Sequence, residues 1–123
     1  MTAFVPADTA VWFEIPVSDF DRARTFYANI LQSEIKVDAD GPNPMAVFVA
    51  KDQSSVAGHL YPGTPAARGT GSTIHLAVAA PLEEALERVT TNGGEVVSPI
   101  VTIPAGRFAY CLDLDGNSFG LFN

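Results

Sequence analysis

A glutamate and a histidine stand at matching positions in two similar segments of this 123-residue chain. Residues 11–31 read VWFEIPVSDFDRARTFYANIL, and residues 72–92 read STIHLAVAAPLEEALERVTTN. An offset of 61 residues aligns the two segments and places Glu14 opposite His75. A carboxylate beside an imidazole can move protons, so Glu14 and His75 are candidates for general acid–base catalysis. The chemistry expected of such a couple is an isomerisation or a 1,2-shift within a carbonyl compound.

A structural role for the same two residues is the alternative. A partly buried carboxylate needs a partner, which His75 or an arginine such as Arg107 would supply to Glu14. Arg107 has two interpretations of its own, because an arginine at a cavity rim either holds a carboxylate or phosphate of a ligand or is simply solvated.

Aromatic side chains accompany these residues. Trp12 and Phe122 offer flat surfaces on which a planar or cationic ligand can stack, and Tyr61 and Tyr110 lie in neighbouring strand-like runs. The alternative is that these rings fill the space between the two halves and form part of the core.

The elements that position these residues follow from the spacing of apolar side chains. In residues 11–17, apolar residues alternate with Trp12, Glu14 and Pro16, so the two sets face opposite sides of a strand. Ser18 is the expected N-cap of a helix over residues 18–31, whose apolar stripe packs on the apolar side of the strand. Three further strands are expected at residues 34–37, 45–50 and 56–61.

The second half repeats this plan. Thr73 and His75 share one side of a strand, a helix follows over residues 81–92, and Gly93 or Gly94 ends it. The last strands are expected at residues 95–98, 108–112 and 118–122, with an Asp-Gly turn before the last one. Because the helices cover one side of each sheet, the polar sides of the first strands are free to line a cavity between the halves.

Composition excludes several classes of protein. The net charge of −7 argues against nucleic acid as a partner, since phosphates need Lys and Arg for neutralisation. The single cysteine, Cys111, leaves no internal disulfide framework, and its strand-like surroundings predict a buried structural thiol. No apolar run approaches a membrane span and no secretory signal is visible, so we expect a soluble, cytoplasmic protein without a membrane partner.

Three segments carry a resemblance over nearly the whole chain. EIPVSDFDRARTFY, NGGEVVSP and GRFAYCLDLDGNSFGL are similar to signatures of the vicinal oxygen chelate superfamily, which includes glyoxalase I, bleomycin-resistance proteins and extradiol dioxygenases. The resemblance implies an α+β fold of two βαβββ modules that form an open, cup-like mixed β-sheet barrel. Module one would span residues 10–61, a linker 62–71 and module two 72–123, within a single domain over residues 1–123.

Enzymes of that superfamily hold a divalent metal such as zinc or nickel with His, Gln or Glu side chains from the first and last strands of each half. The resemblance places these positions at Trp12, at Thr73, at Gly120, and at Gly58 or His59 according to the register. Indole and glycine side chains cannot ligate, and a threonine hydroxyl is a weak ligand.

At most one strong ligand therefore remains, at His59, whereas a bound transition metal needs three or four. We accordingly expect no metal cofactor. The alternative is a displaced metal site built from His59, His75 and Glu14.

Two functions follow from the resemblance. The first is metal-independent binding of a small molecule, comparable with bleomycin-resistance proteins, in a site with Trp12 and Glu14 in its wall. The ligand-binding residues expected are Trp12, His59, Thr73, Tyr110, Gly120 and Phe122. The second is a lyase or isomerase of the lactoylglutathione lyase type, acting on a small carbonyl compound with a divalent metal. Members of the superfamily commonly dimerise, so a homodimer is expected.

Overall fold

The computed structural model describes residues 3–52 and 54–123. The first half of the chain contributes one helix and a four-stranded sheet. Its elements are β1 (Trp12–Val17), α1 (Phe20–Leu31), β2 (Ile35–Asp38), β3 (Met45–Phe48) and β4 (Ala57–Pro62). The strand order is β1-β4-β3-β2, with β1 and β4 parallel and the other neighbours antiparallel. A parallel pair needs a crossover between its strands, which here includes α1, β2 and β3.

The second half repeats this arrangement with one additional short strand, β7. Its elements are β5 (Ile74–Ala77), α2 (Leu82–Thr91), β6 (Glu95–Val96), β7 (Val101–Ile103), β8 (Gly106–Leu112) and β9 (Ser118–Phe122). The order is β5-β9-β8-β6, β5 and β9 are parallel, and β7 also pairs with β8. Two helices and two mixed sheets confirm the expected α+β class.

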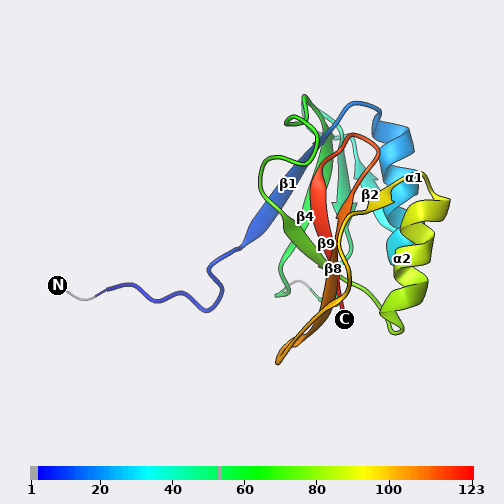
Figure 1. The fold of residues 1–123 in the computed structure, drawn as a ribbon. Coiled ribbons are helices and arrows are strands. Elements are labelled where there is room, and N and C mark those ends of the chain that lie inside the picture. The colour runs from blue at the N-terminus through cyan, green and yellow to red at the C-terminus, as the bar shows by residue number, and fades with distance from the viewer. Residues whose placement is uncertain (1–2, 53) are drawn as a thin grey trace.

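The helices lie side by side and cover the same side of the two sheets (Figure 1). Arg88 of α2 donates from Nε to the carbonyl of Ile30 in α1 at 3.1 Å, which joins them directly. The core is shared between the halves, because Phe119 of β9 packs edge-on against Phe26 and Tyr27 of α1. Apolar residues from both halves therefore bury one another, as alternation along the strands predicts.

The N-terminus of α1 differs from the sequence prediction. Asp19, not Ser18, is the N-cap, and its carboxylate accepts the backbone N–H of Arg22 at 3.1 Å. Ser18 instead donates its hydroxyl, and its backbone N–H, to the carboxylate of Asp115. The sequence correctly predicts that a side-chain oxygen caps this helix. It does not predict that Ser18 donates to Asp115, because nothing in the neighbouring residues indicates so distant an acceptor.

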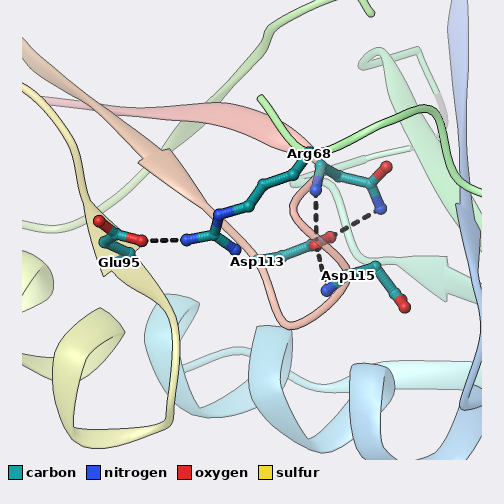
Figure 2. A network of polar contacts seen from close by, with 5 residues as sticks. Arg68, Glu95, Asp113 and Asp115 are labelled. Atoms are coloured by element: carbon teal, nitrogen blue, oxygen red, sulfur yellow. Dashed lines mark hydrogen bonds and ion pairs between the residues drawn. The ribbon is translucent and has the colours of Figure 1, made fainter. Parts of the chain in front are cut away.

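The turn between β8 and β9 ties the two halves together. Asp113 is buried and its carboxylate accepts four hydrogen bonds, two of them from the backbone N–H groups of Asp115 and Asn117 at 2.9 Å. The other two come from the Asn117 side-chain amide at 2.9 Å and from the Tyr27 hydroxyl of α1 at 2.6 Å. Figure 2 shows Asp113 and Asp115 in this turn, with Arg68 of the connecting segment paired to Glu95 nearby.

Two strand predictions in the second half were incomplete. Residues 95–98 were expected to form a strand, but only Glu95–Val96 does so. Strand β7 was not predicted at all; it pairs with the start of β8 in a hairpin that extends away from the sheets (Figure 1). Three residues before a Pro-Ala-Gly turn give too short a pattern for periodicity to detect.

No helix in the described part of the chain is long and apolar enough to cross a membrane.

Candidate ligand pocket

A pocket of about 770 Å³ lies where the start of β1 approaches β5. Its wall is built from Trp12 and Phe13, from residues 73–77 along β5, and from the turn that joins β3 to β4. Leu31 and Ser33, at the C-terminal end of α1, complete it. The volume is within the range of pockets that hold small organic ligands.

Charge in this wall is sparse. Lys51 contributes the one ammonium group, and no Asp or Glu of the described residues lines the pocket. Hydroxyl groups of Ser33, Ser55 and Thr73 and the imidazole of His75 are the other polar side chains. The wall thus combines apolar surface with a few convergent polar groups.

Trp12, His59 and Glu14 form a contact chain on the side of the first sheet that the helices leave open. The Trp12 indole N–H donates to Nδ1 of His59 at 2.8 Å, and Nε2 of His59 lies 3.5 Å from Oε1 of Glu14. The β1–β4 register explains this, since Glu14 is paired with His59 and Trp12 with Ala57. Leu60 points into the core from the opposite side of β4, which resolves the register question in favour of His59.

His75 lies among aromatic rings on the second sheet. Its imidazole is 5.1 Å from the Phe108 ring, 5.7 Å from Tyr110 and 6.4 Å from Phe122, measured between centroids. The ring also covers Gly120, where an added Cβ would collide with its Nδ1. A glycine at residue 120 is what allows the imidazole to occupy this place.

The pairing expected of Glu14 therefore needs correction. We expected the carboxylate beside His75, its counterpart in the repeat, but Glu14 contacts His59, and the rings around His75 belong to strands β8 and β9. Parallel pairing within the first sheet brings Glu14 to β4, and the repeat offset carries no information about that register.

The expected catalytic and ligand-binding residues divide into two groups. Trp12, Thr73 and His75 line the pocket. The others lie outside its wall: Glu14, His59, Tyr110, Gly120 and Phe122.

Arg107 has a structural partner. Its guanidinium donates to the Glu83 carboxylate of α2 at 2.8 Å, and this ion pair lowers the pKa of Glu83. Arg107 therefore does not hold Glu14, and one of the partners proposed for that carboxylate is excluded.

Cys111 is buried, as expected. Burial raises the pKa of its thiol to about 12, so the thiolate needed of a nucleophile is scarce at neutral pH.

Sequence reasoning missed several residues of the pocket wall, above all Phe13, Phe48 and Lys51. The two phenylalanines follow the apolar pattern of core residues, and nothing in that pattern separates a cavity wall from a filled core. Lys51 lies in a polar turn, where a lysine is ordinarily a solvated group. Only the spatial approach of β5 to this turn makes it part of a site.

The comparison with protein families is decisive for classification. The model of one protein family, described as the Glyoxalase/Bleomycin resistance protein/Dioxygenase superfamily, matches residues 9–121. The chain belongs to this superfamily. A search of the curated proteins found no match.

Solved structures show the same fold for glyoxalase-superfamily proteins and for this chain. A hypothetical protein, SA1046 from S. aureus, is 22% identical, with 95% of this chain and 98% of that chain covered and a TM-score of 0.70. A glyoxalase/bleomycin resistance protein from Albidiferax ferrireducens T118 is 20% identical, with 94% and 98% covered and a TM-score of 0.69. The fosfomycin resistance protein FosX from Listeria monocytogenes is 19% identical, with 96% and 91% covered and a TM-score of 0.70.

The donor set at the superfamily's metal positions does not fit a metal ion. His59 is the repeat counterpart of Gly120, because β1–β4 pairs Glu14 with His59 as β5–β9 pairs His75 with Gly120. Among these positions only His59 carries a strong ligand. No group of three or more His, Cys, Asp or Glu side chains suited to a metal occurs within residues 3–52 and 54–123, so His59, His75 and Glu14 do not assemble the displaced site there.

Proposed function

We propose that this superfamily member binds a small molecule in the pocket between β1 and β5, without a metal ion. The observation that carries the proposal is the pocket itself, about 770 Å³ of mostly apolar wall with the Trp12 indole exposed to it. Trp12 is 48% exposed, so its ring has free surface for a ligand to stack on. The donor set at the superfamily's metal positions supports a binding mode in which side chains, rather than a metal, contact the ligand.

The wall favours a neutral or anionic ligand over the cationic one that the net charge permits. Lys51 brings a positive charge, and no carboxylate of the described residues faces the pocket. A flat molecule with a carboxylate or another acceptor at one end would stack on Trp12 and direct that end toward Lys51. The hydroxyl groups of Ser33 and Ser55 would complete its hydrogen bonding.

Binding is tested with matched probes that differ only in charge, namely a substituted benzoate, the corresponding benzamide and a benzyl trimethylammonium ion. Trp12 is the only tryptophan, so a change in tryptophan fluorescence comes from this one residue of the pocket wall, and calorimetry supplies the affinities. We expect the benzoate to bind most tightly. A panel in which no probe changes Trp12 emission, or in which the ammonium ion binds best, contradicts the proposal.

Lys51→Gln is the variant that tests the charge argument. Lys51 is exposed, and an exposed ion pair contributes little, so affinity for the benzoate should fall only about threefold to fivefold while affinity for the benzamide stays unchanged. Lys36→Gln is the matched control, because Lys36 is also exposed, lies on β2 and is outside the pocket wall. Equal loss in both variants would indicate a general charge effect.

The lyase or isomerase function rests on a different observation, the contact between His59 and Glu14. Metal analysis of untagged protein purified without chelators separates the two functions, together with turnover of the hemithioacetal of methylglyoxal and glutathione. Stoichiometric metal with turnover would replace the binding proposal by the enzymatic one.

The proposal includes a homodimer. Strands β1 and β5 each end a sheet and have one hydrogen-bonded neighbour, so each leaves backbone groups that another copy can pair with. Residues 3–11, before β1, extend away from the sheets (Figure 1) and expose Phe4, Val5 and Val11. Sedimentation equilibrium of the full chain tests this, and we expect Phe4→Ser combined with Val5→Ser to weaken association. A monomer at all concentrations contradicts it.

A further inference from the structure

The hydrogen bond between Trp12 and His59 fixes where the imidazole carries its proton. An indole nitrogen can only donate, so Nδ1 of His59, 2.8 Å away, must accept and must be unprotonated. A neutral imidazole holds one proton, which then resides on Nε2. The other side agrees, because Nε2 lies 3.5 Å from Oε1 of Glu14, and a carboxylate can only accept.

Both nitrogens of His59 are thereby committed. A metal ligand needs an unprotonated nitrogen with a free lone pair. In this arrangement the lone pair of Nδ1 accepts the hydrogen bond from Trp12, and Nε2 carries the proton. We propose that Trp12 is a positioning residue that holds His59 in the Nε2–H tautomer, so that the Nε2–H of this imidazole faces the Glu14 carboxylate and neither ring nitrogen is open to a metal ion.

The two residues involved stand at two of the superfamily's metal positions. Trp12 is thus more than a missing ligand, since it also blocks the one imidazole among those positions. The position at Gly120 is obstructed too, because the His75 ring lies where a side chain would begin. A metal site cannot be restored here by a single substitution at residue 120 without displacing His75.

Burial makes the arrangement persistent. The His59 side chain is only 8% exposed and lies between the rings of Trp12 and Tyr61, at centroid distances of 5.8 and 6.0 Å. Water therefore competes poorly for Nδ1, and the ring has little room to turn over. Trp12 and His59 contact each other directly, so the tautomer does not depend on which ligand the pocket holds.

Nitrogen-15 NMR of histidine side chains tests the tautomer, because protonated and unprotonated ring nitrogens differ widely in chemical shift. The untagged chain has two histidines, so in the His75→Asn variant the only remaining histidine signals are those of His59. At neutral pH we expect Nε2 protonated and Nδ1 unprotonated.

Trp12→Phe keeps an aromatic ring but removes the donor, and it should move His59 toward a mixture of tautomers. Tyr61→Phe is the control, since Tyr61 contacts the same ring without hydrogen-bonding to it, and it should change nothing.

Cobalt(II) titration tests the exclusion of metal. In Trp12→Phe the freed imidazole stands beside the Glu14 carboxylate, so we expect cobalt to broaden the His59 signals at concentrations that leave the same signals in the wild type unchanged. Circular dichroism checks that the variant is folded. Protonation of Nδ1 in the wild type overturns the tautomer directly, whatever the variant does. An equal response of the wild type and the folded variant to cobalt overturns the role of Trp12, while ligand binding by the pocket is measured separately with the benzoate probe.

Discussion

Single side chains in this protein are held in defined protonation states by what surrounds them. Tyr27 is fully buried, and burial is the largest of the causes that raise the pKa of its hydroxyl, followed by the negative charge of Asp113. The hydroxyl is the donor in a 2.6 Å hydrogen bond to that carboxylate, so losing its proton would place two negative charges in contact. Burial alone acts on Cys111 in the same direction.

These two groups predict a loss of stability at alkaline pH. The pKa values of both groups are higher in the folded protein than in the unfolded chain. Their contribution to the free energy of unfolding is therefore complete at a pH below the unfolded-chain pKa, and it is lost as the pH rises from there through the folded-state pKa. For Cys111 the pH range of this loss runs from the ordinary pKa of 9.0 to the raised pKa of about 12. For Tyr27 the range begins at the ordinary pKa of 10.0. Urea unfolding between pH 7 and pH 11 should show a flat free energy of unfolding that declines from about pH 9.

Variants separate the two contributions. Cys111→Ala should delay the decline to the tyrosine interval, and combining it with Tyr27→Phe should remove most of it. Tyr110→Phe is the control, because Tyr110 is 38% exposed, whereas the buried tyrosine that donates to Asp113 is Tyr27. A decline that is unaffected by the first two substitutions would contradict the assignment.

At the scale of elements, the turn between β8 and β9 acts as a connector between the halves. Asp113 holds the turn through two backbone N–H groups and reaches α1 through Tyr27, while Asn117 donates to the carbonyl of Pro16 in β1 at 2.9 Å. Gly116 has φ of +82° and packs against Arg68, so the turn also requires a glycine at that point. The Asp-Leu-Asp-Gly-Asn sequence of this turn resembles a family signature, and in this structure it connects the second half to α1 and β1.

Asp113→Ala should destabilise the protein substantially. It leaves buried donors from α1 and from the turn without an acceptor, and we expect the free energy of unfolding to fall by about 3 kcal/mol in urea denaturation. Asp52→Ala is the matched control, because Asp52 accepts from Ser54 and Ser55 in the corresponding turn of the first half but is exposed. Similar losses in the two variants would mean that burial of the Asp113 network does not matter.

The whole molecule is held together by a core to which both halves contribute. Tyr27 of the first half packs against Phe48 of its own sheet and against Phe119 of the other, with ring centroids 5.6 Å apart in each case. One continuous cluster of buried apolar residues results. Neither half could lose its fold without exposing the core of the other.

We therefore expect a single cooperative unfolding transition, in which Trp12 fluorescence, which reports on the first half, coincides with far-ultraviolet circular dichroism of the whole chain. Phe119→Ala should lower the free energy of unfolding by about 3–5 kcal/mol and move both signals together. If this substitution shifted only the circular dichroism signal, the halves would be independent units and the shared core would not couple them.

Local patterns in the sequence determined the elements and the sides that they bury. Alternation in β1 and β5 placed Phe13, Ile15 and Leu76 toward the helices, and both helices lie within two residues of their predicted ends. Periodicity of 2 or 3.6 residues is a property of neighbours along the chain, so it can be read without a structure. The Asp-Gly turn and the burial of Cys111 were predictable for the same reason.

Tertiary structure decided which of these residues meet. Glu14 contacts His59 rather than His75, Lys51 joins a pocket wall, and the Trp12 indole takes the lone pair of an imidazole 47 residues away. Each of these contacts depends on the register between strands and on the packing of one half against the other. Many registers satisfy the same alternation, and the one that is observed buries Leu60 and Phe119 in the shared core.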